Sequence, residues 1–125
     1  MISNVKSGII SAKFEDGEGI LECYEKLALR YKIKNAVVLS GIGMLKGAKM
    51  GYYRERNGKW GYEWKIFSKP VELVSTNGNI MADGSGKRTI HLHAAIAGRD
   101  HILCGGHIGG GNVWIKNEVF VKKLE

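Results

Sequence analysis

The sequence predicts an α+β domain, with a mainly antiparallel β-sheet and one principal flanking α-helix. Only one segment has the apolar spacing of a helix, and most of the remainder consists of short apolar or alternating runs bounded by turn residues. The chain also has 18 glycines and a single proline, Pro70. This composition is typical of tight turns and close backbone approaches rather than of long helices.

A length of 125 residues is typical of one domain, so we expect a single domain over residues 1–125. Apolar residues make up 44% and charged residues 25%, which is close to the globular average and excludes intrinsic disorder. No apolar run has the length of a signal peptide or of a membrane span, so we expect a cytoplasmic protein without a membrane partner. Cys23 and Cys104 lie far apart and indicate neither a disulfide framework nor a cysteine-based zinc site.

One amphipathic helix is expected in the first third of the chain. Its apolar stripe consists of Ile20, Leu21, Tyr24, Leu27, Ala28 and Tyr31. Acidic residues concentrate in its first turns and basic residues in its last, which suits the helix dipole. Asp16 is expected to cap the start of this helix.

Strands are expected on both sides of the helix. Ser7–Phe14 precedes it, and Asn35–Ser40 is a short apolar run of the kind that fills a buried strand. Gly47–Arg54 and Lys59–Phe67 flank Asn57-Gly58, the dipeptide most typical of a two-residue hairpin turn.

The second half of the chain also predicts strands and turns. Val71–Thr76 is followed by another Asn-Gly pair, Asn77-Gly78, which predicts a second turn. Thr89–Ala97 and Ile102–His107 are expected to form a further hairpin, and Val113–Leu124 closes the chain with alternating apolar residues.

Three of the four histidines lie in that last hairpin. Strand alternation puts His91 and His93 on one face, opposite the apolar face that contains Ile96 and must meet the core. If Ile96 and Ile102 both point into the core, His107 shares the face of the other two histidines. A five-residue loop, 97–101, then places His107 opposite His91, at a cross-strand Cβ separation of about 5 Å.

Three converging neutral imidazoles match a zinc ion or a similar divalent metal, with a fourth position open for water or an exogenous ligand. An HxH pair alone is common on exposed strands, so the specificity comes from the third histidine, His107. Gly105 and Gly106 leave room beside it. His101 is expected to be a solvated loop residue, and Cys104 a small buried residue on the core face.

Two further features each allow two interpretations. Glu72 alternates with apolar neighbours, so it is either an exposed strand residue or a hydrogen-bond acceptor or general base near the metal. Gly41 and Gly43 either cradle a phosphate or serve a turn or close subunit packing. The third glycine and the following helix of a dinucleotide motif are missing, which favours the second interpretation.

The 19 Lys and Arg against 12 Asp and Glu give a formal charge of +7, and basic surfaces bind phosphate backbones through counterion release. However, the basic residues are spread along the chain and never form a run of five. The charge therefore favours a solvated exterior over a nucleic-acid surface.

Seven short blocks follow one another in a recognisable order. They are Leu39-Ser40-Gly41-Ile42-Gly43, Ala48–Tyr53, Val71-Glu72-Leu73, Gly78-Asn79-Ile80, His91-Leu92-His93, Gly105-Gly106-His107 and Asn117–Val121. Over nearly the whole chain, this order resembles the plant and prokaryote conserved (PPC) domain, also called the domain of unknown function 296. The resemblance implies an antiparallel sheet with a flanking helix, a homotrimer, and a stand-alone archaeal or bacterial member.

The resemblance also implies that His91, His93 and His107 are the metal ligands. Plant relatives lack these histidines and join the domain to AT-hook segments that bind the minor groove of DNA. This chain has no Arg-Gly-Arg-Pro core. The resemblance therefore supports metal binding here better than DNA binding.

Three classes of function stay open on the sequence alone. The first is a metal-binding homotrimer whose open site binds or transforms a small ligand. The second is a binding or regulatory module in which the metal is purely structural, and the third is a DNA-binding protein that uses its basic surface. An aromatic-rich segment containing Tyr52, Tyr53, Trp60, Tyr62 and Trp64 has more large side chains than one small core hides, which also favours a homotrimer.

Overall fold

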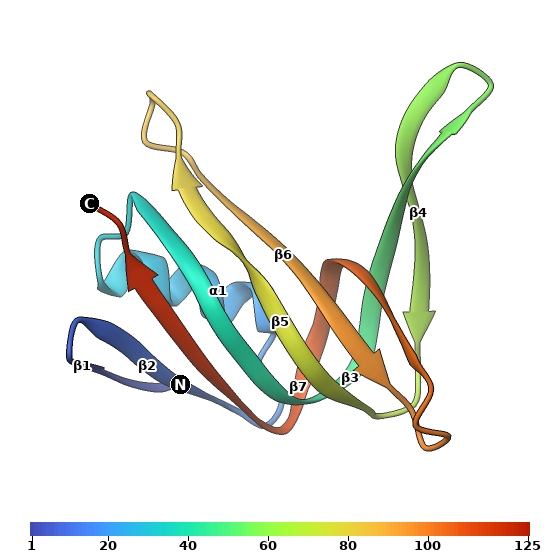
Figure 1. Cartoon of the computed structure of the whole chain (residues 1–125), viewed down its shortest axis with the longest axis horizontal. Coiled ribbons are helices and arrows are strands. Elements are labelled where there is room, and N and C mark those ends of the chain that lie inside the picture. Colours follow the sequence, from blue (N-terminus) through green and yellow to red (C-terminus); the bar gives the residue numbers. More distant parts are fainter.

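The computed structural model describes all 125 residues as seven strands and one helix (Figure 1). In chain order these are β1 (Ile2–Lys6), β2 (Ile9–Glu15), α1 (Ile20–Arg30), β3 (Asn35–Arg56), β4 (Lys59–Phe67), β5 (Val71–Ala82), β6 (Arg88–Ala97) and β7 (Leu103–Lys123). All strand pairs are antiparallel. The predicted α+β class, with one helix beside an antiparallel sheet, is confirmed.

Four of the strands close into a ring. β3 pairs with β5, β5 with β6 and β6 with β7, and β7 pairs back onto β3. The β1–β2 hairpin extends the sheet from the far half of β7, and β4 extends it from the far half of β3. Because β3 and β7 are 22 and 21 residues long, each takes part in several pairings along its length.

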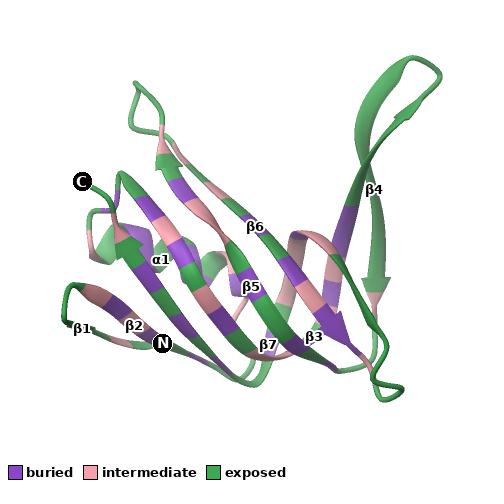
Figure 2. Cartoon of the chain, viewed as in Figure 1, coloured by how far each residue is buried: buried purple, intermediate pink, exposed green.

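The core lies between α1 and the inner face of this sheet (Figure 2). It is one cluster of 24 buried residues, of which Tyr24 and Leu27 of α1 and Phe14 of β2 are completely buried. Phe14 and Tyr24 meet edge to face at 5.1 Å, a favoured aromatic arrangement. The helical stripe expected from the sequence therefore faces the core.

The start of the helix differs from the expectation. Gly19 is the N-cap residue, and no side chain caps the helix. Asp16 instead accepts a hydrogen bond from the Ile115 backbone N–H at 2.6 Å, which ties the β2–α1 loop to β7. The carboxylate satisfies a strand amide whose residue has a left-handed backbone (φ 67°). The hydrogen-bond partner of Asp16 is 99 positions away in the sequence, so local capping patterns do not reveal it.

Several predicted strands prove to be parts of longer ones. Asn35–Ser40 and Gly47–Arg54 are both in β3, and Ile102–His107 and Val113–Leu124 fall largely within β7. The β3–β7 pairing shifts register at four points, one of them between Gly43 and Leu45. The glycines between the predicted strands allow the two long strands to bend and bulge without ending.

The two Asn-Gly pairs behave differently. Asn57-Gly58 forms the turn between β3 and β4, with φ values of 52° and 76°, as predicted. Asn77-Gly78 lies inside β5, so the second predicted turn is wrong. The Asn77 carboxamide donates a hydrogen bond to the Leu39 carbonyl oxygen at 3.0 Å, and a side chain at position 78 would collide with the His91 backbone.

The first strand was not expected. β1 pairs with β2 across a tight turn in which Ser7 and Gly8 have positive φ angles. β1 has the sequence Ile-Ser-Asn-Val-Lys, which lacks the apolar alternation from which a strand is predicted, and most of it is exposed. No helix of the structure is long and apolar enough to cross a membrane.

The most prominent feature outside the core is the arm formed by the end of β3 and by β4. It stands away from the body of the domain (Figure 1), and nearly all of its residues are exposed (Figure 2). Its base lies beside the start of β7, because Gly51 of β3 pairs with both Trp64 of β4 and His107 of β7. The arm therefore begins next to the predicted metal ligands.

Candidate metal centre

His91 and His93 lie on the outer face of β6. The strand alternates as predicted, with Leu92 and Ile96 completely buried and both histidines exposed. Burial of the apolar residues against the core therefore forces the two imidazoles to the same side of the sheet.

His107 of β7 lies on the same face, but in a different register from the expected one. The β6–β7 ladder pairs His107 with His93 and Ile96 with Cys104, so His107 is opposite His93 and not His91. The expected pairing of Ile96 with Ile102 is wrong, because Ile102 lies before β7 begins and is 66% exposed. A shift by two residues preserves the face of every side chain, so the three histidines still meet.

The three imidazoles are close enough to share one ion. His91 Nε2 and His93 Nε2 are 3.2 Å apart, and the ligand atoms of all three residues lie within 4.8 Å of one another. Two nitrogens bound to a tetrahedral ion at 2.0–2.1 Å are about 3.3 Å apart, so the β6 pair has nearly the required separation. No other His, Cys, Asp or Glu belongs to this group.

His107 is the least exposed of the three and is held by aromatic rings of β4. Tyr62 stacks on it with a centroid distance of 4.5 Å and an interplanar angle of 19°, and the Trp64 ring is 5.9 Å away. Burial lowers the pKa of His107, and the charges of His91 and His93 lower it further. The neutral imidazole, which is the form that binds metals, is therefore favoured.

One ring nitrogen of His107 is left without a partner. Its Nδ1 atom is buried and has no hydrogen-bond partner in the chain. A buried polar atom of this kind requires a partner, and a metal ion is a partner to which an imidazole nitrogen donates its lone pair. The donor set, the spacing and this orphaned atom all fit a divalent metal.

Glycines allow the strands around the site to approach closely. A side chain at Gly105 would collide with Ala94 of β6, and one at Gly106 with the backbone of Gly51. Gly106 also has a φ of 154°, which a residue with a side chain rarely adopts. These glycines were expected to leave room for a metal, and the structure shows that they allow β7 to pass between β6 and β3.

Other candidate residues lie away from the histidines. Glu72 is exposed and pairs with Ala97 and Met44, five positions along β5 from the residue opposite His93. The structure therefore does not bring Glu72 to the histidines of its own chain. His101 is exposed in the loop before β7, as expected. Cys104 is exposed, so its predicted burial is wrong, because the start of β7 lies beyond the edge of the core.

Gly41 and Gly43 lie inside β3 and not in a turn. A side chain at Gly41 would press on Thr76 and Tyr24, and one at Gly43 would collide with the β7 backbone near Asn117. They serve close packing within the chain, and neither opens a phosphate-binding loop.

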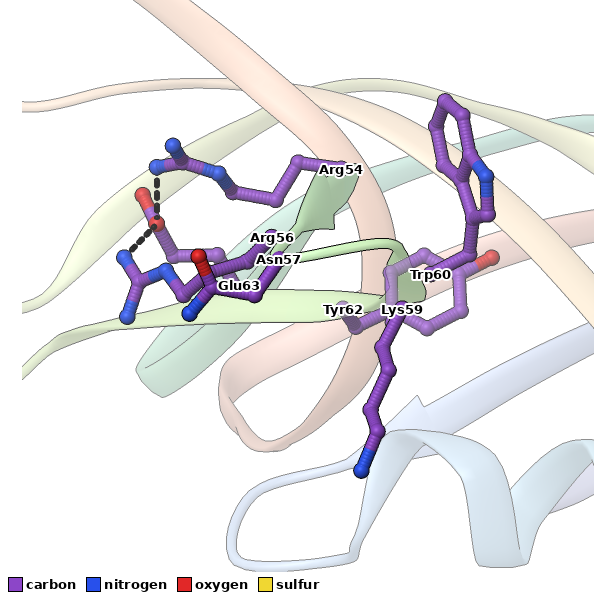
Figure 3. A pocket seen from close by; sticks show the side chains of 8 residues that line it. Arg54, Arg56, Asn57, Lys59, Trp60, Tyr62 and Glu63 are labelled. Atoms are coloured by element: carbon purple, nitrogen blue, oxygen red, sulfur yellow. Dashed lines mark hydrogen bonds and ion pairs between the residues drawn. The ribbon is translucent and has the colours of Figure 1, made fainter.

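A concavity of about 500 Å³ lies on the outer part of the β3–β4 arm, and none of the three histidines lines it (Figure 3). Its cationic side chains include Arg54 and Arg56, which both reach the Glu63 carboxylate, at 2.6 and 3.4 Å. Two of its positive charges are thus partly neutralised within the arm. Nothing in its lining has the convergence of metal-binding groups that the three histidines show.

The feature that sequence reasoning missed is the aromatic neighbourhood of His107. Tyr62 and Trp64 are 45 and 43 residues away in the sequence, and they reach His107 only because β3 pairs with both β4 and β7. Alternation along β4 puts Trp60, Tyr62 and Trp64 on one face, which was a usable signal for an aromatic surface. It carried no information on where that surface lies.

Comparison with solved structures finds close matches to the fold. A plant- and prokaryote-conserved protein of Pyrococcus horikoshii is 26% identical with a TM-score of 0.84, and the match covers 99% of this chain and 82% of that one. A metal-containing protein of Archaeoglobus fulgidus is 26% identical with a TM-score of 0.80, over 98% and 84%. A protein of Ralstonia eutropha described as a candidate DNA-binding protein is 25% identical with a TM-score of 0.84, over 97% and 81%.

No match was found among curated proteins. The profile of the Plants and Prokaryotes Conserved (PCC) domain matches residues 3–125, which is nearly the whole chain. The order of blocks in the sequence, the ring of long strands and the profile match agree. The chain belongs to the Plants and Prokaryotes Conserved domain family.

Proposed function

We propose that this protein binds one divalent metal ion, zinc, through His91, His93 and His107, and that it presents the remaining coordination position to a small ligand. The observation that carries this proposal is the convergence of three imidazoles from two strands, with ligand atoms within 4.8 Å of one another. Because the two β6 histidines are exposed, a ligand reaches the site directly from solvent.

Zinc is the preferred ion because imidazole suits it and because no thiolate or carboxylate joins the group. When bound, it would supply a Lewis acid at an open position. The chain's own contribution is to hold the ligands: the β6–β7 pairing sets His93 opposite His107, and Tyr62 fixes the plane of the His107 ring. The description of the A. fulgidus relative as metal-containing supports the same proposal.

Calorimetric titration of zinc into metal-free protein tests it. We expect one zinc ion per chain, and a loss of affinity of at least about 100-fold in the His107→Ala variant, since losing even an outer partner of a ligand costs 10–100-fold. His101→Ala is the matched control, because this histidine is exposed in the loop before β7 and outside the group. Equal zinc affinity for the wild type and His107→Ala would overturn the proposal.

We also propose that the protein is a homotrimer in which the outer part of the arm, around Tyr53 and Trp60, is covered by neighbouring copies. A two-stranded hairpin is marginally stable alone in water. Here its aromatic face is uncovered, with Tyr53 54% and Trp60 64% exposed. Light scattering is expected to give about 41 kDa, three times the chain mass of 13.8 kDa. A mass near that of one chain would overturn this assembly.

DNA binding is the second candidate, supported by the net charge of +7 and by the description of the R. eutropha relative. The structure offers less for it than for metal binding, because Arg54 and Arg56 of the arm share an ion pair with Glu63. Binding to a DNA duplex measured at several salt concentrations decides the matter. A steep linear fall of log K with log salt would support a phosphate-contacting surface.

A further inference from the structure

The site has an aromatic border that the histidines themselves do not supply. Cross-strand pairing links Trp64 to Gly51, Gly51 to His107 and His107 to His93, so these positions share one face of the sheet. Gly51 has no side chain, and carbons of the Trp64 six-membered ring lie 2.7–2.9 Å from where its Cβ would be. The ring covers Gly109 as well.

This border is open to a ligand. Trp64 is 40% exposed although its ring lies over two glycines. The indole therefore rests on backbone and is still partly exposed to solvent, with its ring centroid 5.9 Å from that of His107. An apolar or aromatic group bound near the histidines would gain contact with this ring.

The charges near the border favour an anion. The Lys49 ammonium lies over the Trp64 ring, 4.7 Å from its centroid. Glu63, the carboxylate nearest in sequence to Trp64, projects from the opposite face of β4 and is bound by Arg54 at 2.6 Å. A divalent ion held by three neutral imidazoles would keep its full charge, because no carboxylate joins the ligand group.

We propose that the small ligand is a carboxylate with an aromatic body, bound through its charge near the metal and Lys49 and through its ring against Trp64. This inference rests on the proposed metal site and names the class of ligand for it. It assigns a binding role to Trp64 and Lys49, neither of which ligates the metal.

The test uses the full protein loaded with cobalt(II), whose visible absorption reports changes at the open position. Three probes are titrated: benzoate, acetate and benzamide. We expect benzoate to bind about 2- to 10-fold more tightly than acetate, because aromatic pairing contributes a free energy that converts to this range. Benzamide has the same ring without the charge, and no binding is expected at the same concentrations.

Two substitutions with matched controls locate the effect. Trp64→Leu is expected to reduce benzoate affinity to that of acetate, while Trp114→Leu, which changes a 38% exposed tryptophan of β7 outside the arm, leaves the benzoate preference unchanged. Lys49→Gln is expected to weaken both acids by roughly 3-fold. Lys65→Gln is its control, since Lys65 makes a similar cation–π contact with Phe67 at 5.0 Å on the opposite face of β4 from Trp64.

The outcomes separate this inference from the proposed function. Failure of the wild type to bind cobalt and zinc would overturn both. Normal metal binding with equal affinity for benzoate and acetate, or for benzoate and benzamide, would overturn the ligand class alone. Unchanged benzoate binding in Trp64→Leu would overturn the role of the ring, and calorimetry with zinc shows independently that this variant keeps its metal site.

Discussion

His107 differs from the other two candidate ligands in its partly buried position. Burial lowers its pKa, and electrostatic repulsion from the neighbouring His91 and His93 lowers it further. The unfolded chain therefore takes up this proton at a higher pH than the folded chain does. The cost to stability is absent well above pH 6.5, the ordinary value for histidine, and grows as the pH falls through about 6.5 toward the folded pKa.

In metal-free protein, the free energy of unfolding is expected to fall less between about pH 7.5 and pH 5.5 in His107→Gln than in the wild type. Urea unfolding at the two pH values, with a chelator present, measures this change. His101→Gln is the control and should leave the pH dependence as in the wild type, since it is exposed in the loop before β7. An identical pH dependence of stability for the wild type and His107→Gln would contradict a lowered pKa of His107 in the folded protein.

Gly78 is the residue at which sequence and structure disagree most directly. It follows Asn77 as it would in a hairpin turn, but a Cβ at this position would collide with the His91 carbonyl oxygen and lie 2.9 Å from Leu92 Cα. We expect Gly78→Ala to lower the free energy of unfolding by on the order of 3 kcal/mol and to weaken zinc binding by displacing His91.

Chemical denaturation and zinc calorimetry on the same sample measure both effects. Gly84→Ala is the matched control, because nothing lies within 4 Å of its added carbon. A Gly78→Ala variant as stable as Gly84→Ala would show that β5 and β6 tolerate a wider separation beside the site.

At the scale of elements, the β3–β4 arm has two faces of opposite character. Tyr53, Trp60 and Tyr62 share one face, where the Tyr53 ring stacks on Trp60 at 5.6 Å and meets Tyr62 at 5.1 Å. Tyr52 pairs with Glu63 on the other, charged face. Only the aromatic face has a reason to be buried against another copy.

The double variant Tyr53→Ser, Trp60→Ser is expected to reduce the mass measured by light scattering toward that of one chain, while circular dichroism shows the sheet intact. Tyr52→Ser removes a more exposed tyrosine, 72% accessible, from the charged face and should keep the wild-type mass. Dissociation by Tyr52→Ser and not by the double variant would place the interface on the opposite face.

The expected strands were too short for a definite reason. The strand predicted over Asn35–Ser40 stops before Gly41 and Gly43, and the strand predicted over Ile102–His107 stops before the glycines at 109–111, because glycine often marks a turn. In this fold they are the places where β3 and β7 bend and shift register, while the backbone pairing continues. A local pattern cannot distinguish these two uses of glycine, since the difference depends on the partner strand.

At the scale of the whole molecule, we expect folding not to depend on the metal. The core is a single cluster of 24 buried residues, and none of the three histidines belongs to it. A domain with such a core folds without a structural ion, in contrast to small zinc domains that unfold when the ion is removed.

A chelator is therefore expected to lower the thermal midpoint without unfolding the protein at 25 °C. Zinc at about 100 times its Kd adds about 2.7 kcal/mol by mass action, which corresponds to roughly 10 °C for a chain of this size. Thermal scans with and without zinc measure the shift, and His107→Ala should show little of it. Loss of the sheet signal on adding the chelator at 25 °C would contradict a metal-independent core.

The sequence by itself determined the fold class, the helix and its buried stripe, the Asn57-Gly58 hairpin, and the common face of the three histidines. These follow from periodicity, because a strand alternates with period two and burial of one face positions the other. Only the tertiary structure decided that His107 lies opposite His93, that Cys104 is exposed, and that Trp64 borders the site. Those facts depend on register and on pairings between distant strands, which are set by the energy of the whole packed sheet and not by any one segment.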